Sequence, residues 1–159
     1  MDFIKKILAP TDLSPFSANG VRYGFNLARA LGAEVILAHA VSTREFMSHA
    51  TSLKITSSGA ETKDLLGKLL ELHEQPLRKF MEEQLVSVGA DLNVHPIVEM
   101  GDAHTLIVNW ASDKAVDLIV MSTHGRSGLP RMILGSVTES SEFVHGGAVH
   151  SLPGRFHLR

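Results

Sequence analysis

The amino-acid sequence predicts an α/β domain in which a mainly parallel sheet lies between two layers of helices. Three observations lead to this three-layer, doubly wound architecture. Short apolar runs that are typical of buried strands alternate along the chain with longer stretches of helical periodicity. The last of these runs, residues 117–121, leads into a glycine-rich loop and then into a helix start. The length of 159 residues fits one domain over residues 1–159 with a sizeable core.

The composition narrows the classes of function. A net charge of −2, with 44% hydrophobic residues, predicts no partnership with nucleic acid or with an anionic membrane. The chain shows neither a bilayer-spanning apolar run nor a signal peptide, so we expect a cytoplasmic protein. The absence of cysteine excludes disulfides, a thiol nucleophile and thiolate metal sites. The nine histidines form no metal-binding motif, so no metal site is predicted and most are expected at the surface.

The first part of the chain predicts a strand–helix–strand unit. Residues 4–9 form an apolar run, and Ser14-Pro15 suits the capped start of a helix. Apolar residues from Val21 to Leu31 follow helical spacing, and Gly32 suits the helix C-terminus. Residues 34–41 are apolar enough for a strand that is buried on both faces.

The middle of the chain is less regular. Residues 41–60 are rich in serine and threonine without a clear apolar period, which predicts a long mobile loop with room for a short helical turn. A leucine stripe over residues 61–88 then predicts a helix that faces the core. Because Pro76 falls inside this pattern, we expect a kink near residues 72–75 or two helices in series.

Two further strands and a helix are predicted before the glycine-rich loop. Residues 92–99 predict the third strand, and residues 116–121 predict the fourth. Between them, Asp102 is the expected N-cap of a helix over residues 103–114.

Two loops at the carboxyl ends of strands carry the chemistry. Pro10-Thr11-Asp12, after the first strand, offers a hydroxyl and a carboxylate. The loop after the fourth strand offers glycines, arginines and a helix start at residues 135–139. A helix N-terminus presents free N–H groups and a positive dipole end to an anion. Because ligands of such sheets bind at strand ends where the connection order reverses, the two loops suit a nucleotide.

Simpler interpretations of the same residues stay open. The glycines at 125, 128 and 135 could serve only to turn the chain, and Asp12 could be an acid favoured by the helix dipole. A Walker P-loop is absent, and Gly-x-Gly-x-x-Gly does not follow the first strand.

With these motifs in view, the chain resembles the universal stress protein family over roughly residues 3–139. The family's ATP-binding branch carries Gly-x-x-Gly, nine residues, and then Gly followed by Ser or Thr. Gly125, Gly135 and Ser136 match this pattern, whereas Ser122 stands where the first glycine is usual. The other segments that carry the resemblance are Ile7–Ser14, Val35–Ala40, Gly101-Asp102 and Asp117–Met121.

The resemblance implies a Rossmann-like fold of the adenine nucleotide alpha hydrolase type, with five strands in the order 3-2-1-4-5. It implies ATP in the crevice, with or without Mg²⁺, and a homodimer. Asp12 and the backbone of Ala40 would lie near the nucleoside, with the glycine-rich loop around the phosphates. The candidate nucleotide-binding residues are Pro10, Thr11, Asp12, Ala40, Met121, Ser122, His124, Gly125, Arg126, Gly128, Gly135, Ser136, Val137 and Thr138.

The predicted function is that of an ATP-binding stress-response or regulatory protein, acting by ligand occupancy and through a protein partner that the sequence does not identify. No catalytic residue is predicted, because no acidic residue lies between Met121 and Thr138. One alternative is a stress protein that binds no nucleotide and works through partners. A slow ATPase and, more weakly, a nucleotidyl-transferring enzyme are the others.

The C-terminal residues 140–159 depart from the family pattern. Gly146-Gly147 should end the last helix early, and only Ala148–Leu152 could form a strand there. We therefore expect an atypical fifth strand and a homodimer weaker than, or built differently from, the family's usual one.

Overall fold

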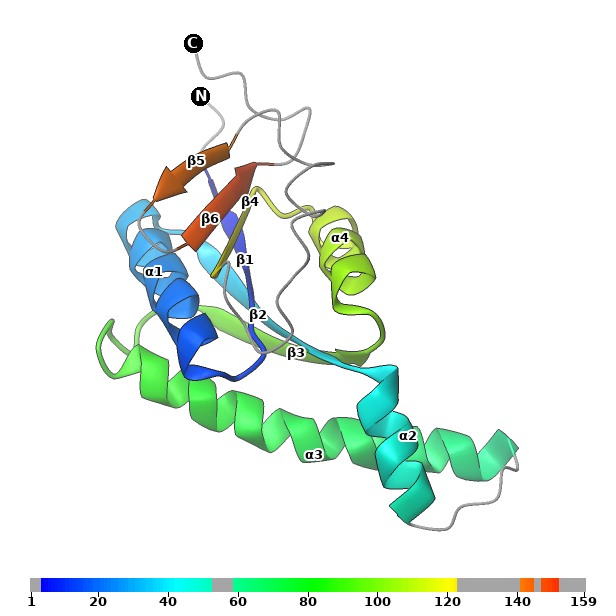
Figure 1. Ribbon diagram of the computed structural model, residues 1–159. Coiled ribbons are helices and arrows are strands. Elements are labelled where there is room, and N and C mark those ends of the chain that lie inside the picture. The colour runs from blue at the N-terminus through cyan, green and yellow to red at the C-terminus, as the bar shows by residue number, and fades with distance from the viewer. Residues whose placement is uncertain (1–3, 53–58, 123–140, 145–146, 152–159) are drawn as a thin grey trace.

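The computed structural model describes residues 4–52, 59–122, 141–144 and 147–151, which form the α/β domain that the sequence predicts (Figure 1). A six-stranded sheet has the order β3-β2-β1-β4-β6-β5. The elements in chain order are β1 (Lys6–Pro10), α1 (Pro15–Leu31), β2 (Glu34–Val41), α2 (Thr43–Ser52), α3 (Gly59–Leu85), β3 (Val94–Met100), α4 (Ala103–Asp113), β4 (Leu118–Ser122), β5 (Ser141–Val144) and β6 (Gly147–Ser151).

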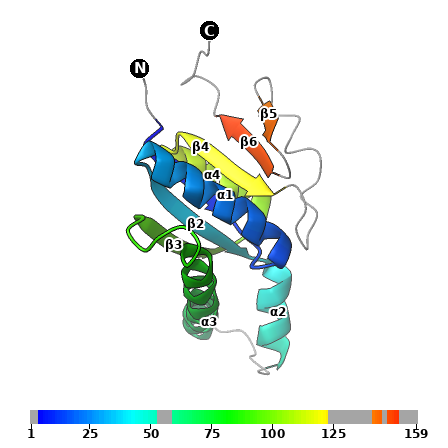
Figure 2. The same ribbon diagram turned by 90° about the vertical axis from the view of Figure 1, so that its left-hand side faces the viewer.

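The sheet separates two hydrophobic cores. Alternate residues of each central strand point to opposite faces, as the pleat requires. Ile7 and Ala9 of β1 pack with α1 and α3, whereas Leu8 packs with Ile107 and Trp110 of α4. Figure 2 shows α1 and α4 on opposite sides of the central strands. This arrangement confirms the predicted three layers, because both faces of the sheet are covered by helices.

The first four strands run parallel in the order 3-2-1-4, as predicted. Leu8 pairs with Ile36 of β2 and with Ile119 of β4, so β1 lies between β2 and β4. β2 in turn pairs with β3 over its length. The chain therefore adds β2 and β3 on one side of β1 and later returns to add β4 on the other side of β1.

The sheet edge beyond β4 differs from the prediction. The fifth position is occupied by β6, which runs antiparallel to β4, and β5 adds a sixth strand antiparallel to β6. Residues 141–144, expected to continue a helix, are therefore a strand. Only residues 145 and 146 separate β5 from β6, and so short a connection permits antiparallel but not parallel pairing.

The ends of α1 match their predicted caps. The Ser14 hydroxyl accepts a hydrogen bond from the Ser17 N–H (3.1 Å), and Pro15 begins the helix. At the other end Gly32 adopts a left-handed φ of 66° and donates its N–H to the last turn. Local sequence signals therefore set both boundaries of this helix.

The segment predicted as a mobile loop contains α2. Ser42 and Glu45 form a capping box, in which the Ser42 hydroxyl accepts from the Glu45 N–H (3.2 Å) and Glu45 Oε2 accepts from the Ser42 N–H (2.9 Å). The loop prediction for residues 41–60 is thus wrong over Thr43–Ser52. The apolar residues of this segment show only a weak helical period, and the hydrogen bonds of the capping box stabilise the helix at its first turn.

The helix α3 is continuous through Pro76, so the prediction of two helices in series is wrong. A proline at this position removes the hydrogen bond to the carbonyl of Leu72. Leu72 is 65% exposed and Pro76 is also exposed, so water can satisfy that carbonyl. α2 and the first turns of α3 extend together beyond the sheet (Figure 1).

β3 is an edge strand, which explains how it tolerates Pro96. The Val35 N–H donates to the Asn93 carbonyl (2.9 Å), and the Gly101 N–H donates to the Val41 carbonyl (3.0 Å). In a parallel ladder these bonds place the odd-numbered residues of β3 toward β2. Pro96 falls on the outward side, where its missing N–H costs no ladder bond.

The predicted N-cap of α4 is confirmed. Asp102 Oδ2 accepts from the Thr105 N–H at 2.9 Å and from its hydroxyl at 3.0 Å. These hydrogen bonds, the backbone one foremost, lower the pKa of Asp102 below its ordinary value. Within the described part of the chain, no helix combines the length and apolar character that a bilayer span requires.

Gly20 holds α1 against the end of β4. A Cβ at this position would lie 2.6 Å from the Ser122 nitrogen, which is too close for either backbone to stay in place. We expect Gly20→Ala to lower the free energy of unfolding by about 1–3 kcal/mol, as overpacking of a core does. Urea denaturation followed by circular dichroism measures this change.

The matched control is Gly67→Ala in α3, where nothing lies within 4 Å of the added Cβ. An alanine in an exposed helix interior should raise stability by about 0.5–1 kcal/mol. Two substitutions of the same kind should therefore shift the urea midpoint in opposite directions. Equal midpoints for Gly20→Ala and the wild type would show that the α1–β4 contact is looser than described.

Candidate functional site

The carboxyl ends of β1, β2 and β4 meet at one edge of the sheet, where the predicted crevice would lie. The chain leaves β1 toward β2, and β4 lies on the other side of β1, so the connection order reverses here. Ligands of open parallel sheets bind at such a reversal. Six of the predicted site residues lie on the strand ends and the turn around this point: Pro10, Thr11, Asp12, Ala40, Met121 and Ser122.

The turn after β1 is held from both sides. The Thr11 N–H donates to the Ala38 carbonyl of β2 (2.8 Å), and the Thr11 hydroxyl accepts from the Leu13 N–H (3.0 Å). The Thr11 hydroxyl also shares a 2.7 Å hydrogen bond with the hydroxyl of Ser17 in α1. The turn is thereby fixed to the neighbouring strand and to the first turn of the following helix.

Asp12 has a structural role in this turn. Its Oδ1 accepts from the Ser14 N–H (2.9 Å), directly before α1 begins. The next residue, Leu13, has a left-handed φ of 62°, which is uncommon for a residue with a side chain. Its side chain packs against the core beside α1. The hydrogen bonds of Thr11 and Asp12 therefore stabilise a backbone conformation that Leu13 would not adopt by itself.

The end of β4 lies close to α1. The carbonyl carbon of Met121 and the nitrogen of Ser122 are the atoms that a side chain at Gly20 would meet first. Ser122, which occupies the position of a glycine in the family motif, is half-buried at the last position of the strand. The chain thus enters residues 123–140 from a fixed point beside the turn after β1.

His39 is a site residue that the sequence analysis missed. It is 6% exposed, so it is an exception to the expectation that most histidines lie at the surface. Its Nδ1 lies 2.9 Å from the Thr11 carbonyl oxygen, and its Nε2 lies 3.2 Å from Nδ1 of His73 on α3. A signal was present in the sequence, because a polar residue inside a strand buried on both faces needs a hydrogen-bond partner.

Glu45 on α2 interacts electrostatically with both His73 and His39. Burial raises the pKa of Glu45, but hydrogen bonds from the Ser42 N–H and hydroxyl and the attraction of His73 and His39 outweigh burial. The net pKa lies below the ordinary value of 4.5. The first turn of α2 is thus electrostatically linked to the histidine pair.

The remaining predicted site residues lie outside the described part of the chain: His124, Gly125, Arg126, Gly128, Gly135, Ser136, Val137 and Thr138. Their assignment to the phosphates stays a prediction. Over the residues that the structure describes, no group of three metal-ligating side chains is present.

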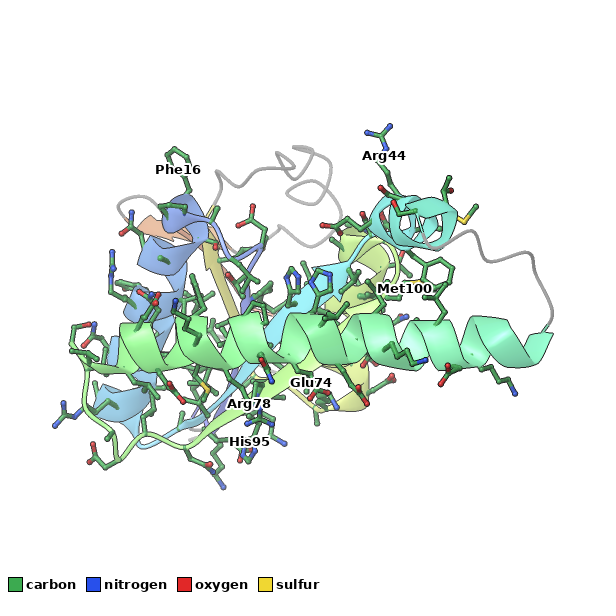
Figure 3. All side chains as sticks on the ribbon, turned by 90° about the horizontal axis from the view of Figure 1, so that it is seen from below. Phe16, Arg44, Glu74, Arg78, His95 and Met100 are labelled. Carbon is green, nitrogen blue, oxygen red and sulfur yellow. The ribbon has the colours of Figure 1, made fainter. Side chains whose placement is uncertain are left out.

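A pocket of about 280 Å³ lies elsewhere, between α3 and the edge strand β3. None of the predicted site residues lines it, so it is distinct from the crevice. In Figure 3 the labelled Glu74 and Arg78, which line this pocket, lie on α3. The lining residues are Glu74, Leu77, Arg78, Pro96, Ile97, Val98 and Glu99.

Comparison with protein families agrees with this architecture. The sequence model of the universal stress protein family matches residues 4–140. The chain belongs to the universal stress protein family. The match covers all four parallel strands, the turn after β1 and the glycine-rich sequence after β4.

Curated relatives are similar over most of their lengths. Universal stress protein MJ0577 of Methanocaldococcus jannaschii is 33% identical over 143 residues, which cover 86% of each chain. Universal stress protein A homolog 2 of Coxiella burnetii is 33% identical over 150 residues, covering 92% of this chain and 91% of the relative. The resemblance therefore extends over most of the chain.

Solved structures show the same fold. The structure of MJ0577 has a TM-score of 0.54 with 29% identity, and it covers 83% of both chains. A universal stress protein solved in complex with cAMP has a TM-score of 0.50 with 20% identity, covering 85% of each chain. At that identity the second structure supports the fold alone.

The lowered pKa of Glu45 predicts a dependence of stability on pH. A carboxyl group whose pKa is lower in the folded chain adds stability above its unfolded-state pKa, and the gain disappears as pH falls through the folded-state pKa. We expect Glu45→Gln to cost a few tenths to about 1 kcal/mol at neutral pH, because the group is largely exposed. The difference from wild type should shrink as pH falls below the ordinary value of 4.5, and it should vanish once pH is below the lowered folded-state pKa.

Urea denaturation at a series of pH values between neutrality and the acid range measures this difference. Glu82→Gln, at an exposed position of α3, is the control for the loss of one carboxylate from the surface. A Glu45→Gln difference that grows as pH falls would contradict the assigned sign.

Proposed function

We propose that this universal stress protein binds an adenine nucleotide, with ATP as the ligand, in the crevice at the ends of β1 and β4. It would act in a stress response by ligand occupancy and by contact with a partner protein, without rapid turnover. The observation that supports this most is the fixed turn Thr11–Asp12 beside the end of β4, at the reversal of connection order.

The described residues fit the nucleoside end of such a ligand. Asp12 brings a carboxylate to the crevice, and Ala40 brings backbone groups from the end of β2. Ribose hydroxyls need hydrogen-bond acceptors, which a carboxylate and a carbonyl provide. Asp12 would also be the residue to hold Mg²⁺ through water.

The phosphate end of the proposal rests on the sequence after β4. Gly125, Gly135 and Ser136 keep the spacing of the family's ATP-binding branch, and Arg126 adds a cation. Backbone N–H groups at a helix start and an arginine are the donors that phosphate oxygens accept.

The homodimer expected from the sequence belongs to the same proposal. β5 is the edge strand of the described sheet beyond β4 and β6. An edge strand presents backbone groups that pair readily with a second chain. Because β5 and β6 replace a single parallel strand, we expect a dimer built differently from the family's usual one.

Titration calorimetry with ATP tests the binding proposal. Gly135→Asp would place a side chain and a negative charge against the phosphates, so the affinity should fall at least about tenfold, or 1.4 kcal/mol. The matched control is Gly67→Asp, which adds the same side chain at an open position of α3. Equal ATP affinity of Gly135→Asp and the wild type would remove the glycine motif from the binding role.

The second part of the proposal concerns turnover. In a single-turnover assay with excess protein, we expect ATP to be cleaved more slowly than about 1 s⁻¹, the lower edge of ordinary enzyme turnover. The reason is that residues 121–138 contain no acidic side chain to orient water or hold a metal ion. Faster cleavage that His124→Ala abolishes would identify the protein as an ATPase.

A further inference from the structure

A chain of hydrogen bonds connects the turn of the crevice to α3. The Thr11 carbonyl oxygen lies 2.9 Å from Nδ1 of His39, and Nε2 of His39 lies 3.2 Å from Nδ1 of His73. The two ring centroids are 5.3 Å apart and the ring planes are inclined by 27°. The three residues come from the loop after β1, from β2 and from α3, so the contacts cross three elements.

The direction of this chain follows from the first acceptor. A carbonyl oxygen can only accept, so Nδ1 of His39 must carry the hydrogen that binds Thr11. In the neutral ring Nε2 of His39 is then an acceptor, and Nδ1 of His73 must donate to it. The order of donation is therefore His73 to His39 to Thr11, and the His73 donor and the Thr11 acceptor favour the same tautomer of His39.

The same hydrogen bonds control the backbone of the turn. Thr11 is 7% exposed, so its carbonyl would be buried without a partner if His39 changed tautomer or turned away. Its N–H is bound to Ala38 of β2, so β2 holds both backbone groups of Thr11. Thr11 and Asp12 in turn hold Leu13 at its left-handed φ of 62°.

We propose that His73 is a positioning residue for the nucleotide crevice. Together with the Thr11 carbonyl, it keeps His39 in the Nδ1–H tautomer, and His39 thereby holds the turn that presents Asp12. The part of this inference that concerns the ligand rests on the proposed function. The part that concerns the turn does not, because it follows from the contacts alone.

Through His73, the turn of the crevice is connected to α2 and α3, the two helices that extend beyond the sheet. His73 lies near the middle of α3, and Glu45 at the start of α2 is electrostatically coupled to it. A partner that moved α2 or α3 would therefore change the donor to His39, and with it the turn at Asp12. Coupling between two binding events is reciprocal, so nucleotide would change the affinity for such a partner by the same factor.

Nuclear magnetic resonance of the imidazole nitrogens tests the tautomer directly. At about pH 8, well above the ordinary pKa of histidine, wild-type His39 should show a protonated Nδ1 and an unprotonated Nε2. A wild-type ring with its hydrogen on Nε2 would overturn the proposal, whatever any variant does. In His73→Phe, which keeps an aromatic ring but has no donor, the Thr11 carbonyl alone favours the Nδ1–H form, so we expect a detectable fraction of the Nε2–H tautomer beside it.

His73→Asn is the conservative variant, because its side-chain amide places an N–H near the position of Nδ1. It should restore the single tautomer of His39. His95→Phe is the matched control, since His95 is an exposed histidine on β3 whose Nε2 lies 3.4 Å from Oε2 of Glu34. Failure of His73→Asn to restore the tautomer that His73→Phe loses would mean that ring packing, not donation, is the contribution of His73.

Two further measurements separate this inference from the proposed function. Exchange of the Leu13 and Ser14 amide hydrogens, which bind Thr11 and Asp12, should be about three- to tenfold faster in His73→Phe than in wild type. The dissociation constant for ATP should rise by a similar factor in His73→Phe and stay unchanged in His95→Phe. If the wild type binds no ATP but its Leu13 and Ser14 amides exchange more slowly than those of His73→Phe, the proposed function is refuted. His73 then remains the residue that positions the turn.

Unchanged amide exchange in His73→Phe, with the His39 tautomer intact, would overturn the inference.

Discussion

The close packing of α1 against β4 is the constraint on which the arrangement of the molecule depends. Gly20 and Gly24 lie on the face of α1 that meets β4, and Gly20 leaves no room for a Cβ beside the Ser122 nitrogen. This contact sets the distance between the start of α1 and the end of β4. Because α1 begins at the turn after β1, the same contact brings that turn beside the point where the glycine-rich sequence begins. Backbone packing therefore determines the geometry of the crevice before any functional side chain contributes.

The crevice is built from polar contacts that have structural reasons of their own. The Thr11 hydroxyl, the Asp12 carboxylate and the His39 ring each bind a backbone group of the turn. A left-handed Leu13 persists only because these contacts outweigh its conformational cost. A turn fixed in this way can present a carboxylate without first having to become ordered, which lowers the cost of binding a ligand.

The two edges of the sheet are built differently. At β3, Pro96 removes an outward N–H, and α3 packs over the strand. At the other edge the chain folds back on itself, so that β6 pairs with β4 and β5 pairs with β6. The extended pair α2 and α3 lies at the end of the sheet where the histidines meet, so the crevice and these helices share His39 and His73.

The sequence by itself determined the α/β class, the four parallel strands and the caps at Ser14, Gly32 and Asp102. These features depend on apolar periodicity or on hydrogen bonds between residues three positions apart, which a linear pattern records. The capping box of Ser42 and Glu45 was equally local, although the serine-rich composition obscured it. The candidate residues Thr11 and Asp12 were predicted from their place after a strand.

Only the tertiary structure decided the contacts between distant segments. The burial of His39 and its pairing with His73, 34 positions away, depend on where α3 crosses the end of β2. The continuity of α3 through Pro76 depends on which of its faces meets solvent, and the direction of β6 depends on a hairpin with β5. A sequence pattern records which residues are apolar or polar, whereas these outcomes depend on which surfaces remain exposed after the domain has packed.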